Sequence, residues 1–491
     1  MLKQINYSLK FYILIIFSAI FFSVPSYLFA AENTITPMPA GIDRFRLPGV
    51  EVKPAGNPSS KHKNDRTDML TEPTLPRTVE LSGPMLTLEE CLTLAYANSP
   101  EITEARLYVE QYEAKVRQAL SLYIPNASIV LSHIDYGIPA LHSSYDNNAA
   151  TVQLSHVFYD SGKRSELVNA ANNALNAANY AFLSTWNHKA YQVTKAYYDL
   201  IYAYWLTGIC EDDLEKTQEN LNIAQSFYKT GSKARIDVTQ AEIQARSSET
   251  KIIEARTALF NAYANLITAI GCDIADLKIR RIDDDLNYAI DFSSRDEIIT
   301  KMLSSNPTLF YYDYLRLSCL DLSKSHLTDK LPIFSANAMW GSKSKWGISD
   351  QSWAVNFQIT IPLLKNTESK AYSDEQKAIA AQMESKKQNE ILKLKNQIDT
   401  SIANIFSGKL KTEAAYRSVQ TALLNYQLSY LRYKKGVSSI IELNNSIDFL
   451  NNARREYLKS LYDIRLGNAL LKQAVGLPLP KNADIDEQNG D

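Results

Sequence analysis

The sequence has few of the residues that build metal sites, disulfide frameworks and tight turns. Its 491 residues include 6 His and 4 Cys, and no two cysteines form a Cys-x-x-Cys pair. The 16 Gly and 17 Pro are too few for a chain of many short strands and turns. A metal centre and an all-β fold of short strands are therefore disfavoured, and no cofactor is predicted.

An excess of charge of one sign is also missing, since 52 basic residues stand against 54 acidic ones. A nucleic-acid-binding protein normally carries a basic excess or a basic patch. The sequence also has no Ser/His/Asp order, no glycine-rich phosphate loop and no His-x-x-x-His helix. We therefore predict neither an enzyme nor a nucleic-acid partner.

The first thirty residues have the layout of a secretory signal peptide. Lys3 and Lys10 precede an apolar run from Phe11 to Phe22, and Ala30 and Ala31 offer a cleavage site. The alternative is an uncleaved anchor, because the stretch from position 11 to 31 is long enough to cross a bilayer. We predict a signal peptide over 1–30 and therefore an exported protein.

The segment 31–85 is polar, rich in proline and without a steady period, so we predict an extended lead segment there. After the signal peptide no run approaches about 18 apolar residues, so no further transmembrane helix is expected. An exported protein without such a helix is either soluble or a β-barrel.

The remainder of the chain is an internal duplication. Four landmarks recur in the same order, two at an offset of 207 residues and two at an offset of 205: Pro100 and Pro307, Pro125 and Pro332, Gly231 and Gly436, Gly271 and Gly476. The predicted repeats are 86–272 and 293–477, with a connection over 273–292 and a tail over 478–491.

Hydrophobic periodicity changes in the same way within each repeat. A short helix and a helix of about two dozen residues precede two alternating segments, at about 125–159 in the first repeat and 332–362 in the second. Long helical hairpins follow over 162–270 and 367–475. The first helix of each hairpin is expected to be about 100 Å long. Outward-facing loops are predicted over 137–149 and 342–351.

The clearest strand pattern lies in the second repeat, where apolar residues alternate with Asn356, Gln358 and Thr360. Each predicted strand is long enough to cross a bilayer, yet four strands cannot close a barrel. Copies of the chain must therefore share one. Two copies would give a filled eight-stranded barrel, and three would give twelve strands and a passage lined by these polar residues.

The order of motifs resembles the TolC family of outer-membrane efflux proteins. The residues that carry the resemblance are Leu86-Thr87-Leu88-Glu89-Glu90, Asn98-Ser99-Pro100, Phe158-Tyr159-Asp160-Ser161-Gly162, Tyr228-x-x-Gly231, Pro362-Leu363-Leu364, Tyr433-x-x-Gly436 and Val475-Gly476-Leu477. The resemblance implies a mainly α-helical homotrimer with a shared twelve-stranded β-barrel in the outer membrane and a helical conduit in the periplasm.

The resemblance also implies a function. Members of the family are passive exit ducts for efflux or type I secretion. They dock to a periplasmic adaptor and to an inner-membrane pump or ABC exporter, which would supply the energy. The competing hypothesis is a soluble or anchored periplasmic coiled-coil adaptor or scaffold. An adaptor would carry one helical hairpin, whereas this chain carries two with strands between them.

The Tyr-x-x-Gly turns are predicted to form the periplasmic tip, with Tyr228 and Tyr433 one helical turn before Gly231 and Gly436. Asp237 and Glu442 follow the glycines by six residues. In a trimer each would form a ring of three carboxylates that favours cations. The alternative is that both are acids at helix starts that complement the helix dipole.

One position departs from the family pattern. Some members carry a basic residue two positions past the second glycine, where this chain has Ser438. Lys233 and Arg235, after the first glycine, are candidates for latch or adaptor contacts, or else part of a solvated charged turn. Cys91 and Cys272 are considered as a disulfide pair, with buried free thiols as the alternative.

Overall fold

The longest elements follow from the scarcity of helix breakers. Helix α5 (Lys163–Lys229) and helix α9 (Asn366–Lys434) contain no proline and one glycine each. Backbone hydrogen bonding therefore continues over 67 and 69 residues. Both long helices predicted at the start of the hairpins are present.

The computed structural model describes residues 86–138, 143–272, 294–345 and 348–476, all of which belong to one unit of the chain, Thr78–Leu479. The predicted signal peptide (1–30), lead segment (31–85), connection (273–292) and tail (478–491) lie outside the described residues.

The two halves of the described chain carry the same order of elements, which confirms the predicted, mainly helical, duplicated fold. The first half comprises α3 (Leu88–Asn98), α4 (Pro100–Ser121), β1 (Asn126–Ile138), β2 (Ser143–Tyr159), α5 and α6 (Arg235–Ile270). The second half comprises α7 (Arg295–Ser305), α8 (Pro307–Thr328), β3 (Ile333–Lys345), β4 (Ile348–Thr360), α9 and α10 (Ile440–Val475).

Local sequence explains how the helices begin. Pro100 and Pro307 occupy the first position of α4 and α8, where a fixed φ suits the helix and no backbone N–H is needed. Thr87 and Glu90 form a capping box at the start of α3, with both hydrogen bonds at 3.2 Å. The Asn-Pro and Ser-Pro corners therefore set where one helix stops and the next starts.

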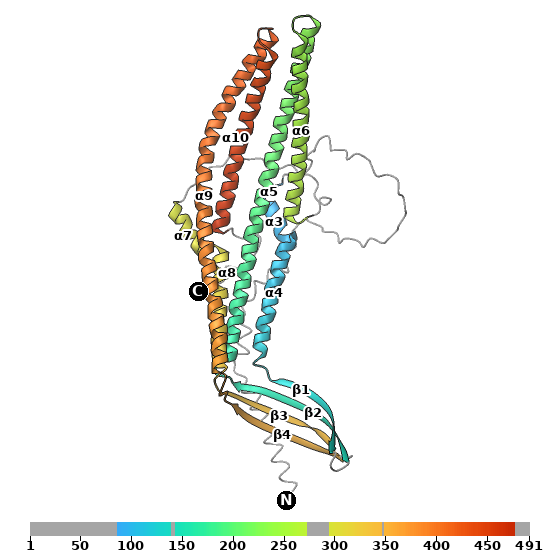
Figure 1. Ribbon diagram of the computed structural model, residues 1–491, viewed down its shortest axis with the longest axis vertical. Helices are drawn as coiled ribbons and strands as arrows, with labels where there is room; N and C mark the ends of the chain where they lie inside the picture. The colour runs from blue at the N-terminus through green and yellow to red at the C-terminus, as the bar shows by residue number, and fades with distance from the viewer. Residues whose placement is uncertain (1–85, 139–142, 273–293, 346–347, 477–491) are drawn as a thin grey trace, which may run out of the picture. The chain divides into compact units, whose positions relative to one another are not determined.

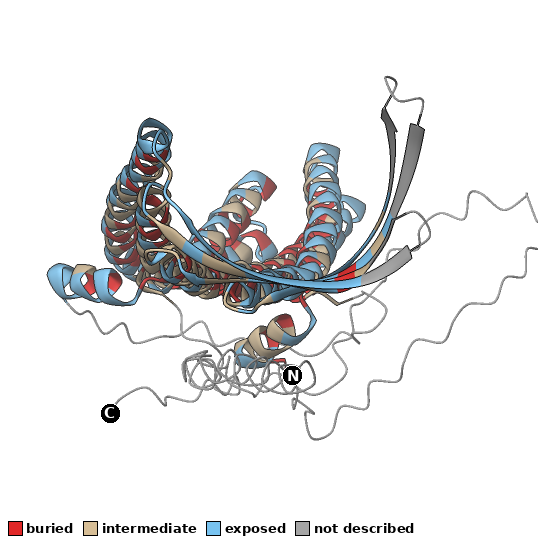
Figure 2. Cartoon of the chain, turned by 90° about the horizontal axis from the view of Figure 1, so that it is seen from below, coloured by how far each residue is buried: buried red, intermediate tan, exposed pale blue. Residues whose placement is uncertain are grey.

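The helices pack as two hairpins that lie side by side. Each long helix contacts the returning helix of its own hairpin, and α5 also contacts α10, which joins the hairpins (Figure 1). Buried residues follow the helices, whereas the sheet is mostly exposed (Figure 2). One apolar cluster lies where α3, α5 and α6 meet and includes Val193, Leu200 and Leu266.

The four strands form one antiparallel sheet in the order β1-β2-β3-β4, so β1 and β4 are its two edges. The strands extend further than the sequence pattern predicted. The predicted loops over 137–149 and 342–351 are wrong in their bounds. Strand pairing continues into both ranges, as far as Ile138 and Ser143 in the first and Lys345 and Ile348 in the second. Backbone pairing does not need alternating side chains, so polar residues there remain in strands.

Within the described ranges, none of the helices combines the length and the apolar character needed to cross a membrane.

Candidate functional site

The ends of the two helical hairpins are tight turns with the same geometry. Gly231 has φ +72° and Gly436 has φ +75°. The N–H of Ser232 donates to the carbonyl of Phe227 at 2.9 Å, and that of Val437 donates to the carbonyl of Arg432 at 3.0 Å. A Cβ on either glycine would have open space, so the left-handed backbone is what requires glycine there.

The equivalent tyrosines of the two turns lie in different surroundings. Tyr228 is 47% exposed, whereas Tyr433 is 0% exposed and packs edge-on against Phe227 with ring centroids 5.8 Å apart. Burial, together with the nearby charge of Asp237, raises the pKa of Tyr433 to about 12. Its buried hydroxyl makes no hydrogen bond within the described chain. Tyr433 is therefore an apolar anchor between the hairpin ends.

Lys233 links the two turns directly. Its Nζ donates to the carbonyl of Ser438 at 2.9 Å and lies 5.9 Å from the centroid of the Tyr433 ring. Arg235, the other basic residue after the first glycine, is exposed. A lysine of the first turn therefore reaches the second turn at Ser438.

Glu442 has a partner that sequence reasoning missed. The guanidinium of Arg432 donates to Glu442 at 2.9 Å, and the Ser439 hydroxyl accepts the Glu442 backbone N–H. Both candidate aperture acids, Asp237 and Glu442, lie in the first turn of a helix. The Arg432–Glu442 spacing of ten residues across a glycine turn is the signal that could have indicated this pair.

Polar contacts also join the hairpins well away from their tips, and we call this line of contacts between α5/α6 and α10 the hairpin seam. Arg454 pairs with Asp212. Asp213 is fully buried and accepts from Asn451 at 2.6 Å and from Ser248 at 2.9 Å. A buried carboxylate is costly unless it is hydrogen-bonded, so these donors are required there. A further link of the seam joins Gln244 to Asp448 at 3.1 Å.

The sheet has one polar and one apolar face. Directly opposite residues on antiparallel strands share a face, so the register defines rows across all four strands. One row of the polar face is Asn126, Ser155, Asn337 and Asn356, and Gln358 and Thr360 lie on the same face. Two rows of the apolar face are Ala127, Leu154, Ala338 and Val355, and Ile129, Val152, Trp340 and Trp353.

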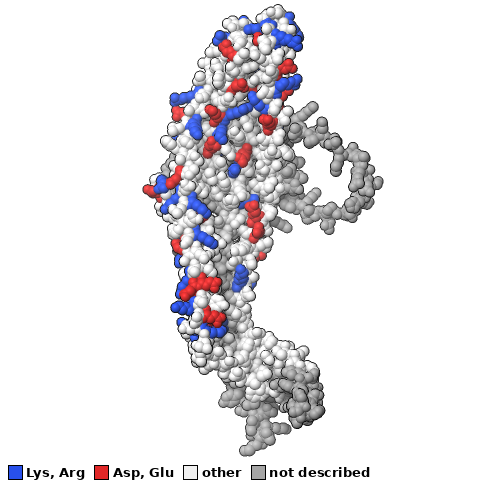
Figure 3. Space-filling model, viewed as in Figure 1, with Lys and Arg blue, Asp and Glu red and all other residues white. Residues whose placement is uncertain are grey.

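Charged residues are distributed very differently between helices and sheet. On the face shown in Figure 3, Lys, Arg, Asp and Glu are spread along the helices, while the described part of the sheet carries none. The strand residues 126–133, 148–159, 333–342 and 351–360 include no charged side chain. Among them, Phe357, Trp340 and Trp353 are more than half exposed. Such a surface is unusual for a sheet in contact with water.

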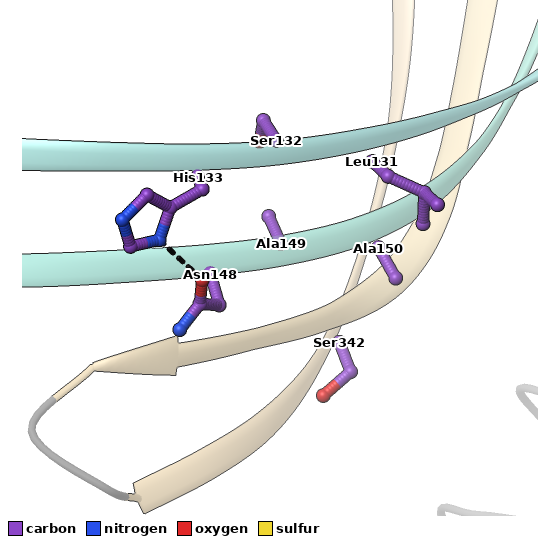
Figure 4. A pocket seen from close by; sticks show the side chains of 7 residues that line it. All are labelled: Leu131, Ser132, His133, Asn148, Ala149, Ala150 and Ser342. Carbon is purple, nitrogen blue, oxygen red and sulfur yellow. Dashed lines mark hydrogen bonds between the residues drawn. The ribbon is translucent and has the colours of Figure 1, made fainter.

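A pocket of about 490 Å³ lies on the sheet and is lined by Leu131, Ser132, His133, Asn148, Ala149, Ala150 and Ser342 (Figure 4). The His133 ring and the Asn148 amide are hydrogen-bonded at 2.6 Å. The lining has no charged residue and no arrangement of nucleophile and base. In the described part of the chain, no group of three or more potential metal ligands comes together.

All four cysteines are free thiols. Cys91 is fully buried, and burial is the main reason that its pKa is raised to about 12. Cys272 accepts a weak contact from Asn98 at 3.5 Å. The considered Cys91–Cys272 disulfide is therefore absent, and the alternative of free thiols holds.

Comparison with known proteins identifies related sequences. Residues 91–272 match the model of the outer membrane efflux protein family. Protein CyaE of Bordetella pertussis is 27% identical over 197 residues, a match that covers 39% of this chain and 40% of that protein. The matched region therefore spans less than half the length of this relative.

Solved structures share the fold over most of the chain. The outer-membrane channel OprN matches with a TM-score of 0.72 at 13% identity, covering 80% of this chain and 90% of OprN. The CmeC outer membrane channel of Campylobacter jejuni matches with a TM-score of 0.70 at 18% identity, covering 79% and 85%. The outer membrane protein VceC of Vibrio cholerae matches with 0.68 at 15%, covering 79% and 96%. At these identities the likeness is one of fold.

Proposed function

We propose that the chain is a member of the outer membrane efflux protein family and a passive exit duct across the periplasm and the outer membrane. The cargo would be small molecules or secreted protein handed over by an inner-membrane machine. The proposal assigns no catalytic step and no cofactor to the chain.

The two-faced sheet is the observation that carries the proposal. Its apolar face, with Trp340 and Trp353 in one row, suits contact with outer-membrane lipid. Its polar face, with Asn356, Gln358 and Thr360, suits a water-filled lumen. A soluble adaptor or scaffold would have no reason to keep one face of a sheet apolar and free of charge.

Closure of the sheet requires more than one copy. Strands β1 and β4 are unpaired edges, and a lipid-exposed edge leaves backbone groups without partners. Three copies would give twelve strands, enough for a passage, so the proposed assembly is a homotrimer. The helical hairpins then extend into the periplasm, where their tips meet an adaptor that belongs to a pump or an ABC exporter.

The tip residues are proposed to hold the resting state of the duct. Lys233 ties the first turn to the carbonyl of Ser438, and Tyr433 fills the space between the turns. Glu442 would contribute the narrowest acidic ring, although Arg432 offsets its charge within the chain. Opening would separate these contacts, which makes Lys233 the latch and leaves exposed Arg235 for the adaptor.

Fractionation and conductance test this function. The protein is expected in the outer-membrane fraction, as detergent-dependent trimers that change mobility on heating, and it should open channels in planar bilayers. Glu442→Gln should lower the preference for cations, with Glu456→Gln, an exposed residue further along α10, as the control. A monomeric protein that stays soluble without detergent would contradict the proposal and favour the adaptor or scaffold.

A further inference from the structure

The duplication relates contacts inside one chain to contacts between copies. Helices α6 and α10 both span 36 residues, and the turn glycines before them are 205 residues apart, as are the glycines after them. In a ring of copies, each hairpin has its own chain's other hairpin on one side and a hairpin of the next copy on the other. A contact within the hairpin seam therefore has an equivalent across the subunit boundary, found by shifting each residue by 205.

The ion pair of the hairpin seam has such an equivalent, with its charges exchanged. Asp212 of α5 corresponds to Arg417 of α9, and Arg454 of α10 corresponds to Glu249 of α6. The pair inside the chain has its acid on the long helix, while the equivalent pair between copies would have its base there. Arg417 is 75% and Glu249 40% exposed, and each has only a local partner on its own helix.

A second contact of the seam changes from polar to apolar under the same shift. Gln244 and Asp448, which are hydrogen-bonded at 3.1 Å, correspond to Phe449 and Ile243. These two side chains are among the large apolar residues most open to solvent in the helices, at 63% and 64% exposed. An apolar contact between copies would bury both of them.

We propose that α9 and α10 of one copy dock against α6 of the next through an Arg417–Glu249 ion pair and a Phe449–Ile243 apolar contact. This inference rests on the proposed homotrimeric duct and names the residues of its subunit boundary. It uses exposed residues whose ion pairs, where they have them, are to neighbours on their own helix.

The exchanged charges also determine the order of hairpins around the ring. Two first hairpins placed side by side would bring Asp212 against Glu249, and two second hairpins would bring Arg417 against Arg454. Both arrangements oppose like charges, which disfavours them. Only the alternating order pairs acid with base at every boundary, so the ring closes with the two hairpins in turn.

Charge reversal tests the ion pair in the full-length protein. Arg417→Glu and Glu249→Arg should each shorten the lifetime of the detergent-purified trimer at a fixed temperature by roughly threefold or more. The double variant Arg417→Glu with Glu249→Arg should return it to nearly the original value.

The matched controls alter the local partners. Glu413 and Arg246 hold Arg417 and Glu249 on their own helices, so Glu413→Gln and Arg246→Gln should leave the trimer lifetime unchanged. Single reversals with an unchanged trimer, or a double variant no better than the worse single one, would overturn the ion pair.

Crosslinking tests the apolar contact independently of stability. With Ile243→Cys and Phe449→Cys in one chain, a short bismaleimide should give covalent dimers and trimers but no larger species. Gln244→Cys with Asp448→Cys should instead give a bridge within one chain and no increase in mass. Each single cysteine variant serves as the control for crosslinks made through the four native thiols.

The two proposals fail differently. If the unmodified protein is a monomer, the duct itself is contradicted. If it is a trimer whose Ile243→Cys and Phe449→Cys sites yield only monomers after crosslinking, the duct stands and this boundary is wrong.

Discussion

The two helical hairpins have nearly the same length and the same turn geometry, yet they use equivalent positions differently. Tyr228 of the first is half exposed, whereas Tyr433 of the second is buried against Phe227. The glycines of the two long helices, which are not at equivalent positions, also differ: a Cβ on Gly208 would meet nothing, whereas a Cβ on Gly408 would lie 2.7 Å from Ile464. The second hairpin is thus packed closely at Tyr433 and Gly408, although along its length α5 of the first hairpin is more buried than α9.

The difference shows that duplication conserves the path of the chain and not its chemistry. Backbone geometry at a helix stop needs glycine in both copies, because only φ > 0 closes the turn. The side chains one helical turn before these glycines can differ, because only the second of the two tyrosines packs against the other hairpin.

The largest effect is expected at the buried tyrosine. Tyr433→Ala should lower the local stability of the tip by about 3–5 kcal/mol, because it removes a fully buried aromatic ring. Tyr228→Ala should cost about 1 kcal/mol, since half of that side chain is already in water. Hydrogen exchange of the two turns measures both. Equal effects would show that the two tyrosines are not used differently.

Glycine replacement should act in opposite directions in the two long helices. Gly408→Ala should destabilise by about 1–3 kcal/mol, because the new methyl group overlaps Ile464. Gly208→Ala should stabilise by about 1 kcal/mol through helix propensity. Thermal unfolding checks the signs, and Ile464→Ala, which removes the overlapping Cγ1, should make the Gly408→Ala change less destabilising than it is beside Ile464. A stabilising Gly408→Ala would contradict the close packing of α9 on α10.

Removing the proposed latch should have a smaller effect. Lys233→Met loses the hydrogen bond to the Ser438 carbonyl and should weaken the tip by about 1 kcal/mol. In planar bilayers it should raise the fraction of time that the channel is open. Arg235→Met, at an exposed position, is the control and should change neither quantity. An equal change in both variants would point to general charge loss.

Alkaline pH should weaken the tip through the same buried tyrosine. The folded-state pKa of Tyr433 is raised from 10.0 to about 12, so the folded protein holds this proton more tightly than the unfolded chain does. Its contribution to stability is complete below pH 10 and declines as the pH rises towards 12. Tyr433→Phe should remove this part of the loss of stability at high pH, as measured by hydrogen exchange of the tip. A variant with an unaltered profile would contradict the raised pKa.

Much of the fold could be predicted because it depends on local signals. The long helices follow from the absence of proline, and the turns follow from glycine at Gly231 and Gly436. The alternation in β4 predicted its two faces, and the register then extends these faces to the other strands. The ends of the strands were missed because polar side chains near Asn148 hide backbone pairing that needs no apolar pattern.

The contacts of the tip could not be predicted in the same way. The hydrogen bond from Lys233 to Ser438 joins residues 205 apart, and nothing local indicates which hairpin surfaces face one another. Burial of Asp213 was equally hidden, because an acidic residue on a long helix is usually solvated. The sequence duplication shows that Asp212 is replaced by Arg417 in the second repeat. Only the structure shows that Asp212 pairs with Arg454 of the other hairpin, which makes the replacement informative.

The two free edges of the sheet have a consequence for biogenesis. In the proposed duct, a single copy would present unpaired backbone along β1 and β4 and an exposed apolar face. Such a surface promotes aggregation in water. If the proposal holds, pairing with sister chains and entry into lipid have to be coupled in time, and the helical part is expected to fold first and to bring the strands of different copies together.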